Sequence, residues 1–385
     1  MFLLKLLIRN ALRHKLRTFL TVLSVAVAVL AYCLLQTVID AWYSGVRISS
    51  STRLITRNAG SLILPLPMSY REKIRQVDGV KNVSFGVFFG GVYIDEKNFF
   101  PNFGGEVKTF LEIYPEYVLT PEDKEEFLKD KRSAIAGQKL ANQFSWKKGD
   151  KVILKGTIYP GQWEFVIKGI YKGRDRNVDE TRFFFHWDYI NEQLKKMQST
   201  RADHIGFYIV EITAPELAAV VSERIDSMFK NSIAQTHTET EKAFQLGFVS
   251  MSDSIIMALS AVSYIVIMII LAVVANTINM STRERIGEYA VFKTLGFGGL
   301  KIGGLILGES LIITTVGSML GIVLSFPAAE VFKEKVGTTI PVFYITGNTI
   351  LEGLFISVIV GLLASIIPIY RGVRTPIVEG LRRIV

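Results

Sequence analysis

The chain has 385 residues, a formal net charge of +9, and 49% hydrophobic residues. Its mean hydropathy of +0.33 is too high for an ordinary water-soluble protein of this length. The basic residues gather beside long apolar runs, which points to membrane topology and excludes nucleic acid as the expected partner.

Four apolar runs reach the ~20 residues that a helix needs to cross a bilayer. They lie near residues 18–39, 254–276, 301–326 and 350–369. Basic residues precede the first run, separate the second from the third, and follow the fourth, so both termini are expected inside. The sequence therefore predicts a membrane α-helical protein with four transmembrane helices and an extracytoplasmic α/β domain of two lobes between the first and second.

We expect the chain to contain nine parts. They are a cytoplasmic amphipathic N-terminal helix (1–17), four transmembrane helices (18–43, 254–280, 300–328 and 350–369), a periplasmic α+β domain (44–253), a cytoplasmic loop with a short helix (281–299), a short periplasmic loop (329–349) and a cytoplasmic tail (370–385). The first apolar run is longer than a signal-peptide core and lacks a small-residue cleavage site. Because Cys33 is the only cysteine, no disulfide within the chain can stabilise the outer domain.

Apolar and basic residues alternate at helical spacing at the start of the chain. Leu3, Leu6 and Leu7 share one face, with Lys5 and Arg9 around them. This pattern is typical of a helix that lies in the membrane interface, as an anchor or with a coupling role.

The predicted outer domain alternates short helices and strands. Helical patterns fall within 68–77 and 133–144 and after Pro215, and strand patterns near 80–85, 152–154, 163–170 and 205–212. Thr213 and Glu216 have the spacing of a capping box for the helix after Pro215. An aromatic run, Phe183, Phe184, Phe185 and Trp187, favours a buried strand but leaves an apolar ligand site open. The pairs Phe88-Phe89 and Phe99-Phe100 carry the same two alternatives.

No pattern of catalytic or metal-binding residues stands out. His186, His204 and His237 are too widely separated to match a metal-ligand spacing. A calcium-like loop begins at Asp175, but Glu180 stands where the turn glycine is required. The phosphate-binding G-x-x-x-x-G-K-[ST] pattern is absent, so ATP and magnesium would have to be bound by another chain. The sequence predicts no enzyme, no metal and no cofactor.

The loop between the second and third runs has the most specific pattern. Ser281 and Glu284 predict a capping box, and Gly296 predicts the end of a short helix. Ile286, Tyr289, Ala290 and Lys293 share a helical face, which suits docking into a soluble partner's groove or resting on lipid. In the third run, Gly317 and Gly321 have the spacing for close helix approach, and Glu309 requires a partner within the membrane.

This loop resembles the signature of MacB-type ABC transporter permeases, in which an arginine, an Ile-Gly pair, an alanine and a later glycine recur. Similarity extends to residues 9–18, 307–311, 367–369 and 375–382. The family includes lipoprotein-releasing and cell-division permeases. Many members carry an acidic residue just before the Ile-Gly pair, where this chain has Arg285, so Glu284 or Glu288 is expected to supply the partner-facing carboxylate.

The resemblance implies a bacterial inner-membrane homodimer, or a pair with a paralogous permease, in contact with membrane lipids. A separate cytoplasmic ABC ATPase would bind ATP and magnesium, and a periplasmic adaptor or carrier protein is a further expected partner. The expected ATPase-coupling residues are Arg283, Glu284, Arg285, Ile286, Gly287, Glu288, Ala290, Lys293, Leu295 and Gly296. Those expected for dimer or transmembrane packing are Gly308, Glu309, Gly317 and Gly321.

Three functions remain open at this point. The resemblance favours the permease subunit of an exporter or trafficking machine for a hydrophobic, lipid-like, lipoprotein, drug or peptide substrate. A subunit of the same architecture that transports nothing and activates a periplasmic effector mechanically is the alternative. An unrelated receptor is the third, and the sequence contains no kinase or long cytoplasmic segment to support it.

Overall fold

The structure, a computed structural model, describes residues 14–336, 340 and 342–378. The chain divides into two compact units, which we call the helical unit and the sheet domain. The helical unit contains the four long helices, and the sheet domain contains Ala41–Ser252.

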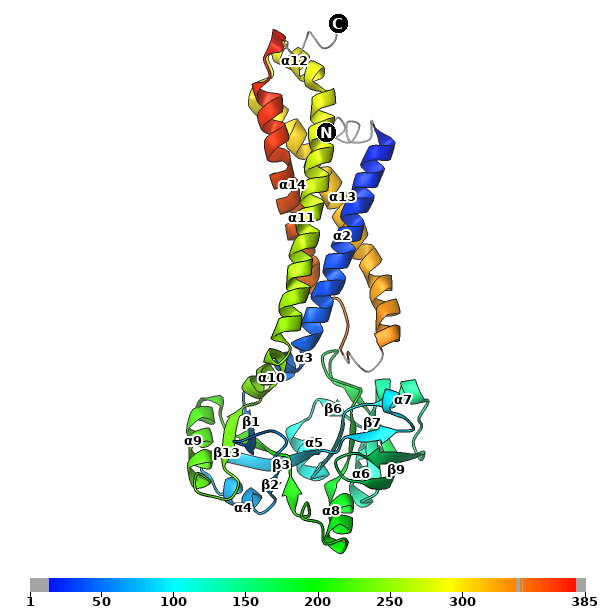
Figure 1. Cartoon of the computed structure of the whole chain (residues 1–385), viewed down its shortest axis with the longest axis vertical. Coiled ribbons are helices and arrows are strands. Elements are labelled where there is room, and N and C mark those ends of the chain that lie inside the picture. The colour runs from blue at the N-terminus through cyan, green and yellow to red at the C-terminus, as the bar shows by residue number, and fades with distance from the viewer. Residues whose placement is uncertain (1–13, 337–339, 341, 379–385) are drawn as a thin grey trace. The chain divides into compact units, whose positions relative to one another are not determined.

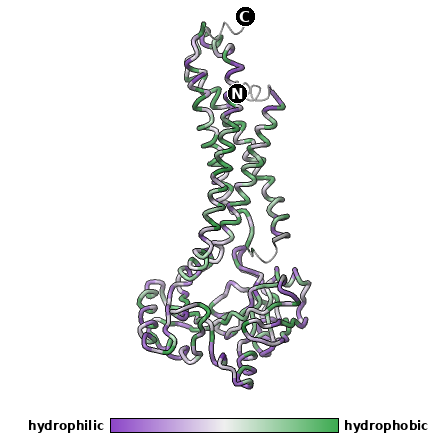
Figure 2. Tube along the Cα trace, in the orientation of Figure 1, coloured by the Kyte–Doolittle hydropathy of each residue, from purple (hydrophilic) through white to green (hydrophobic). Residues whose placement is uncertain are grey.

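The helical unit is built on α2 (Lys15–Trp42), α11 (Asp253–Glu284), α13 (Gly299–Val336) and α14 (Gly347–Arg374). All four are long and apolar enough to cross a membrane, and apolar residues run along each of them (Figure 2). A mixed α/β domain is inserted between α2 and α11. The predicted fold class is therefore confirmed, and the chain is a multi-pass membrane protein.

Inside the helical unit, α11 and α14 pack along each other (Figure 1). Ile270, Val274 and Ile278 of α11 share a buried core with Val360 and Ala364 of α14. A short helix, α12 (Ile286–Thr294), connects α11 to α13. We call the end of the unit that carries α12 the loop side.

The helix ends differ from the expected boundaries. The helix α13 continues to Val336, so it includes the first part of the short loop that was predicted over 329–349. At the loop side, α11 continues to Glu284, four residues beyond the predicted end at 280. Of the amphipathic helix predicted over 1–17, residues 1–13 lie outside the described residues, and α2 begins at Lys15.

The sheet domain is organised around one sheet of eleven strands. Its members are β1 (Arg53–Asn58), β3 (Val80–Phe88), β4 (Gly91–Tyr93), β5 (Asn102–Gly105), β6 (Tyr117–Val118), β7 (Ser133–Gly137), β8 (Lys151–Gly156), β9 (Gly161–Gly173), β10 (Phe183–His186), β12 (Phe207–Ile212) and β13 (Thr236–Thr240). Their order is β13-β1-β12-β3-β5-β10-β7-β9-β8-β4, and β6 pairs with β9. The β5–β10 and β7–β9 pairs are parallel and the other pairs are antiparallel. The two expected lobes therefore share one continuous sheet, and β2 (Leu66–Pro67) pairs separately with β11 (His204–Ile205).

Short helices cover this sheet. They are α3 (Ser44–Ile48), α4 (Tyr70–Arg75), α5 (Val107–Ile113), α6 (Pro121–Lys129), α7 (Gln138–Phe144), α8 (Trp187–Lys196), α9 (Ala218–Met228) and α10 (Glu241–Ser250), with the 3-10 turns η1 (Glu96–Asn98) and η2 (Pro215–Leu217). The predicted cap at Thr213 is wrong, because the hydroxyl of Thr213 donates to the carbonyl of Gly79, 3.4 Å away, and Ala214 precedes η2.

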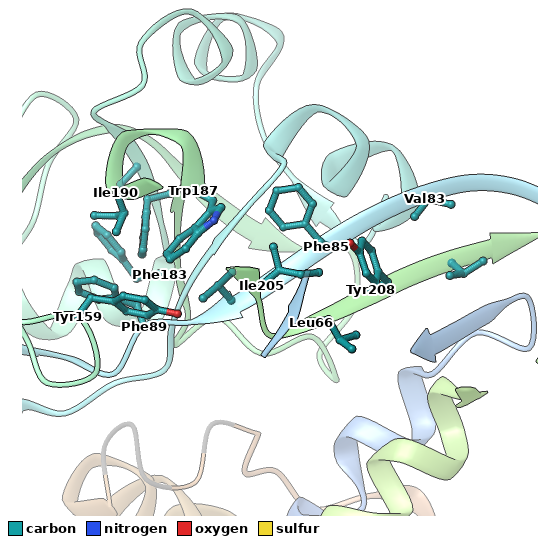
Figure 3. Close-up of a cluster of buried hydrophobic side chains, with 14 of the residues drawn as sticks. Leu66, Val83, Phe85, Phe89, Tyr159, Phe183, Trp187, Ile190, Ile205 and Tyr208 are labelled. Carbon is teal, nitrogen blue, oxygen red and sulfur yellow. The ribbon is translucent and has the colours of Figure 1, made fainter. Parts of the chain in front are cut away.

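The strand β10 explains the aromatic run. Phe183 and Phe185 belong to one hydrophobic core and Phe184 to another, because successive side chains of a strand point to opposite faces of the sheet. Trp187, which begins α8, is also fully buried. Figure 3 shows Phe183 and Trp187 packed with Phe89. The structure thus places the whole run in the core rather than at a ligand site.

Candidate functional site at the helix between α11 and α13

The helix α12 is bounded by a break at Arg285 and a turn at Gly296. Gly296 has a left-handed backbone, with φ +85°, which glycine adopts readily. The N–H groups of Gly296 and Phe297 donate to the carbonyls of Lys293 and Phe292, over 3.0 and 2.9 Å. These bonds satisfy carbonyl groups that would otherwise be unpaired at the end of the helix. Gly296 thus ends α12 at the residue where the sequence placed the stop.

The predicted capping box at Ser281 and Glu284 is wrong, because both residues lie inside α11. The hydroxyl of Ser281 donates instead to Oε1 of Glu309 on α13, over 2.8 Å. A cap can form only where a helix begins, and here the first helix continues for another turn.

A buried ion pair connects the start of α12 to α13. Arg285 and Glu309 are 4% and 6% exposed, and Nη1 of Arg285 lies 3.0 Å from Oε2 of Glu309. With Ser281 on the other oxygen, both oxygens of the Glu309 carboxylate accept a hydrogen bond. This arrangement removes the large cost of an isolated charge in the membrane. Arg285, expected to face a partner protein, therefore points into the helical unit.

Glu284 pairs with a different helix. Both of its oxygens accept hydrogen bonds from the Arg17 guanidinium of α2, over 2.7 and 2.8 Å, and Nε2 of His14 lies 3.4 Å away. Glu284 is therefore engaged within the chain rather than free as the expected partner-facing carboxylate. Glu288, the other candidate, is half-buried on α12.

The face of α12 predicted to dock a partner is turned inward instead. Tyr289 and Ala290 are buried, and burial beside the Glu309 carboxylate raises the pKa of Tyr289 to about 12, so its hydroxyl stays protonated. The ammonium of Lys293 donates to the carbonyls of Val373, over 2.8 Å, and Thr375, over 2.6 Å. A cation is favourable there because it meets the negative end of the α14 dipole.

The other side of α12 and the following turn are exposed and largely apolar. We call these residues the turn surface: Val291, Thr294, Leu295, Phe297 and Leu300. Leu295 is 69% and Leu300 is 95% exposed. Exposed apolar residues that cluster in this way mark interaction sites more often than chance exposure does. Leu295 is an apolar member of the expected coupling residues that the structure leaves exposed.

The glycines predicted for close helix approach pack within the chain. A Cβ atom on Gly317 would lie 2.7 Å from Cβ of Val25, and one on Gly321 would lie 2.5 Å from the carbonyl oxygen of Ala26. Both contacts are with α2. The pair therefore brings α13 and α2 together, while Gly308 is half-buried on α13.

A second charged cluster lies in the sheet domain. Arg53 is 4% exposed and contacts two buried carboxylates, Glu241 through Nε at 2.7 Å and Glu116 through Nη1 at 2.8 Å. The hydroxyl of Tyr114 donates to Glu241 over 3.0 Å, and burial with this carboxylate holds the pKa of Tyr114 well above its ordinary value. Sequence reasoning missed this cluster, because its members are far apart in the chain.

A cavity of about 580 Å³ adjoins this cluster. Two ion pairs lie in its lining, Arg53 with Glu116 and Lys81 with Glu211. Among the described residues, no group of histidine, cysteine and acidic side chains could hold a metal ion. His186 instead bonds the Phe127 carbonyl through Nε2, over 2.6 Å.

The sequence of the helical unit is similar to that of a known protein family. Residues 260–377 match the FtsX-like permease C-terminal family. An uncharacterized ABC transporter permease protein of Mycobacterium tuberculosis is 24% identical over 192 residues, which is 48% of this chain but only 21% of that protein. An uncharacterized ABC transporter permease of Methanocaldococcus jannaschii is 25% identical over 322 residues, covering 80% of this chain and 77% of the relative.

Two solved structures align with about half of the chain. The extracellular domain of the noncanonic ABC-type transporter YknZ from Gram-positive bacteria has a TM-score of 0.36 at 11% identity, over 49% of this chain and 98% of that one. A domain of a permease protein from Porphyromonas gingivalis has a TM-score of 0.34 at 12% identity, over 49% and 88%. On a framework of four helices long and apolar enough to cross a membrane, the chain is similar in sequence to FtsX-like ABC transporter permeases.

Proposed function

We propose that the chain is the membrane subunit of an ABC complex in which a separate ATPase docks on the turn surface. ATP and magnesium are bound by that ATPase, and this chain holds no cofactor. The loop side is then the cytoplasmic side of a bacterial inner membrane, and the sheet domain is periplasmic. A second copy, or a paralogous permease, completes the membrane part.

The observation that carries this proposal is the contrast between the two sides of α12. Tyr289 and Ala290 are buried, whereas Leu295 and Leu300 are exposed on a connection between two long apolar helices. Apolar side chains held outward on a rigid helix end suit the groove of a soluble partner. Arg283 is also exposed, in the last turn of α11 before α12 begins.

The inner contacts of α12 support a relay role. Arg285 joins α12 to Glu309 of α13, and Lys293 joins it to the last carbonyls of α14. Because α12 also follows α11 directly, a push on the turn surface displaces three membrane helices together. The proposed outcome is export or trafficking of a hydrophobic, lipid-like, lipoprotein, drug or peptide substrate, with an adaptor or carrier on the outer side.

A second candidate function is mechanical activation of a periplasmic effector without transport. The sheet domain favours it in one respect, since Phe183, Phe185 and Trp187 are core residues and the cavity beside Arg53 has a largely charged lining. Neither feature suits an apolar cargo. Reconstituted complexes separate the two functions: ATP-dependent extraction of labelled lipid or lipoprotein supports transport, and ATP turnover without extraction supports mechanical activation.

Co-purification in mild detergent with the ATPase encoded beside this chain tests the docking surface. We expect the wild type to capture the ATPase and Leu295→Glu to lose it, because a buried unpaired charge opposes docking. Ile63→Glu, at a position in the sheet domain that is 92% exposed, is the matched control and should leave capture intact. A wild-type chain that is folded and captures no ATPase would contradict the proposal.

A further inference from the structure

The junction of α11 and α12 carries two ion pairs that point to different helices. Glu284 pairs with Arg17 of α2, and the next residue, Arg285, pairs with Glu309 of α13. Two neighbouring residues thus connect this junction to two other helices, α2 and α13.

The two pairs differ in burial. The side chains of Arg285 and Glu309 are 5% and 8% exposed, while those of Arg17 and Glu284 are 26% and 36% exposed. Breaking a buried pair leaves an uncompensated charge and costs far more than breaking an exposed one. The Arg285–Glu309 pair is therefore part of the framework, whereas the Arg17–Glu284 pair can be removed without loss of the fold.

The geometry of the exposed pair is nevertheless favourable. Nη1 and Nη2 of Arg17 donate to the two oxygens of the Glu284 carboxylate, and Nε2 of His14 lies 3.4 Å from it. Paired parallel hydrogen bonds of this kind fix orientation as well as distance. The contact therefore holds α2 in one position relative to the end of α11.

Among the described residues, several apolar side chains in the loop-side part of α2 are exposed. Leu16, Phe19 and Leu20 are exposed, and contact with Gly317 of α13 is made further along α2, at Val22 and Val25. The hydroxyls of Thr21 and Thr277, 3.2 Å apart, provide a second contact with α11. At its other end, α2 continues into α3 and the first strand of the sheet domain.

We propose that Arg17 and Glu284 are positioning residues that carry α2 along when α12 is displaced, so that motion at the turn surface reaches the sheet domain through α2. This inference rests on the proposed docking of an ATPase at α12. It assigns the relay a specific contact, in addition to the covalent connection through α11.

A distance measurement tests this role. Spin labels at Leu16→Cys and Met280→Cys, both exposed positions, are placed in a Cys33→Ser chain, because Cys33 is the only native cysteine. The distance is compared in the ATPase complex without nucleotide and with the ATP state trapped by vanadate. We expect no change in the wild-type background and a nucleotide-dependent shift in Arg17→Gln and in Glu284→Gln.

Charge reversal separates this role from a merely structural one. The double variant Arg17→Glu with Glu284→Arg restores the pair and should restore the constant distance, while Lys15→Gln, an exposed neighbour, should behave as wild type. A constant distance in Arg17→Gln, or a shift in the wild type, overturns the proposal. If no ATPase is captured, the proposed function fails independently of this inference. The distance between the two labels is then measured in the chain alone, where Arg17→Gln should broaden the distance distribution. An unchanged distribution in Arg17→Gln overturns the proposed role of the contact.

Discussion

Each unit contains a buried arginine, Arg285 directly after α11 and Arg53 at the start of β1, and their surroundings differ. Arg285 pairs with the Glu309 carboxylate, which also accepts a hydrogen bond from the Ser281 hydroxyl. Arg53 contacts two carboxylates and also donates to the carbonyls of Ile48 and Ile113.

The difference follows from the solvent around each unit. In a membrane, an excess charge is expensive, so one cation is matched by one anion. In the sheet domain, water lies close by and a single arginine can connect several segments, even with one carboxylate in excess. The same residue type thus joins two helices in one unit and three separate segments in the other.

The largest effect is expected at Arg53. Arg53→Met leaves Glu116 and Glu241 buried without a cation, so the free energy of unfolding of the sheet domain should fall by about 3–5 kcal/mol. Thermal unfolding and hydrogen exchange of β1 measure this loss. Arg57→Met is the control, because the Arg57–Glu239 pair is partly exposed and should be worth less than about 1 kcal/mol. Equal losses of stability in both variants would show that the buried Arg53 cluster contributes no more than the partly exposed Arg57–Glu239 pair.

The second-largest effect is expected for Arg285→Met, which should lower the free energy of unfolding of the helical unit by about 3 kcal/mol. Only Glu309 loses its cation in this variant, and Ser281 still donates to it. Thermal unfolding of the detergent-solubilised chain measures the loss. The double variant Arg285→Met with Glu309→Gln removes the stranded charge and should recover most of the stability. No recovery in the double variant would mean that the pair contributes by packing rather than by charge.

Gly321→Leu tests how α2 is held in the helical unit. A Cβ at this position would lie 2.5 Å from the Ala26 carbonyl oxygen, so the helices must separate, at a cost of about 1–3 kcal/mol. The same thermal unfolding assay applies. Gly304→Leu, where a Cβ meets nothing within 4 Å, should be nearly neutral, and a comparable loss there would contradict the packing argument.

The smallest effect depends on pH and concerns the sheet domain. Burial lowers the pKa of His186 below its ordinary value, so the unfolded chain binds this proton more readily than the folded one. The stability that neutral His186 gives the folded sheet domain is therefore fully present above about pH 6.5 and is lost as pH falls. The free energy of unfolding should fall by no more than about 1.4 kcal/mol per pH unit from this residue. Unfolding at pH 7.5 and 5.5 should show a steeper decline in wild type than in His186→Gln, and parallel declines would refute the assignment.

The sequence identified the four membrane helices because hydropathy depends on composition alone. It misplaced their ends, since α11 continues to Glu284 through side-chain contacts with other helices rather than through a local signal. In the sheet domain, the run from Phe183 to Phe185 is apolar throughout because both faces of β10 are covered. Phe89 and Phe100 are likewise buried, whereas Phe88 and Phe99 are exposed, a division that local pattern could not decide.

The sequence pattern identified the loop between α11 and α13. Arg285 and Glu284, expected to face a partner protein, instead pair with other helices of the chain. The partners of Arg285 and Glu284 lie 24 and 267 residues away, and no spacing rule covers such distances. One signal was available: a carboxylate at Glu309, inside a membrane helix, requires a cation near the same depth, and Arg285 precedes the start of that helix. Local helix signals, such as the stop at Gly296, were sufficient because the bonds they predict are local.

Photo-crosslinking tests the central claim, that the turn surface is where an ATPase docks. A photoreactive residue at Leu295, in a complex purified with the ATPase, should give a crosslink between the two chains. The same residue at Ile366, exposed on α14 within a membrane-crossing segment, should give none. An ATPase that co-purifies yet crosslinks elsewhere and not from Leu295 would contradict this account of the docking site.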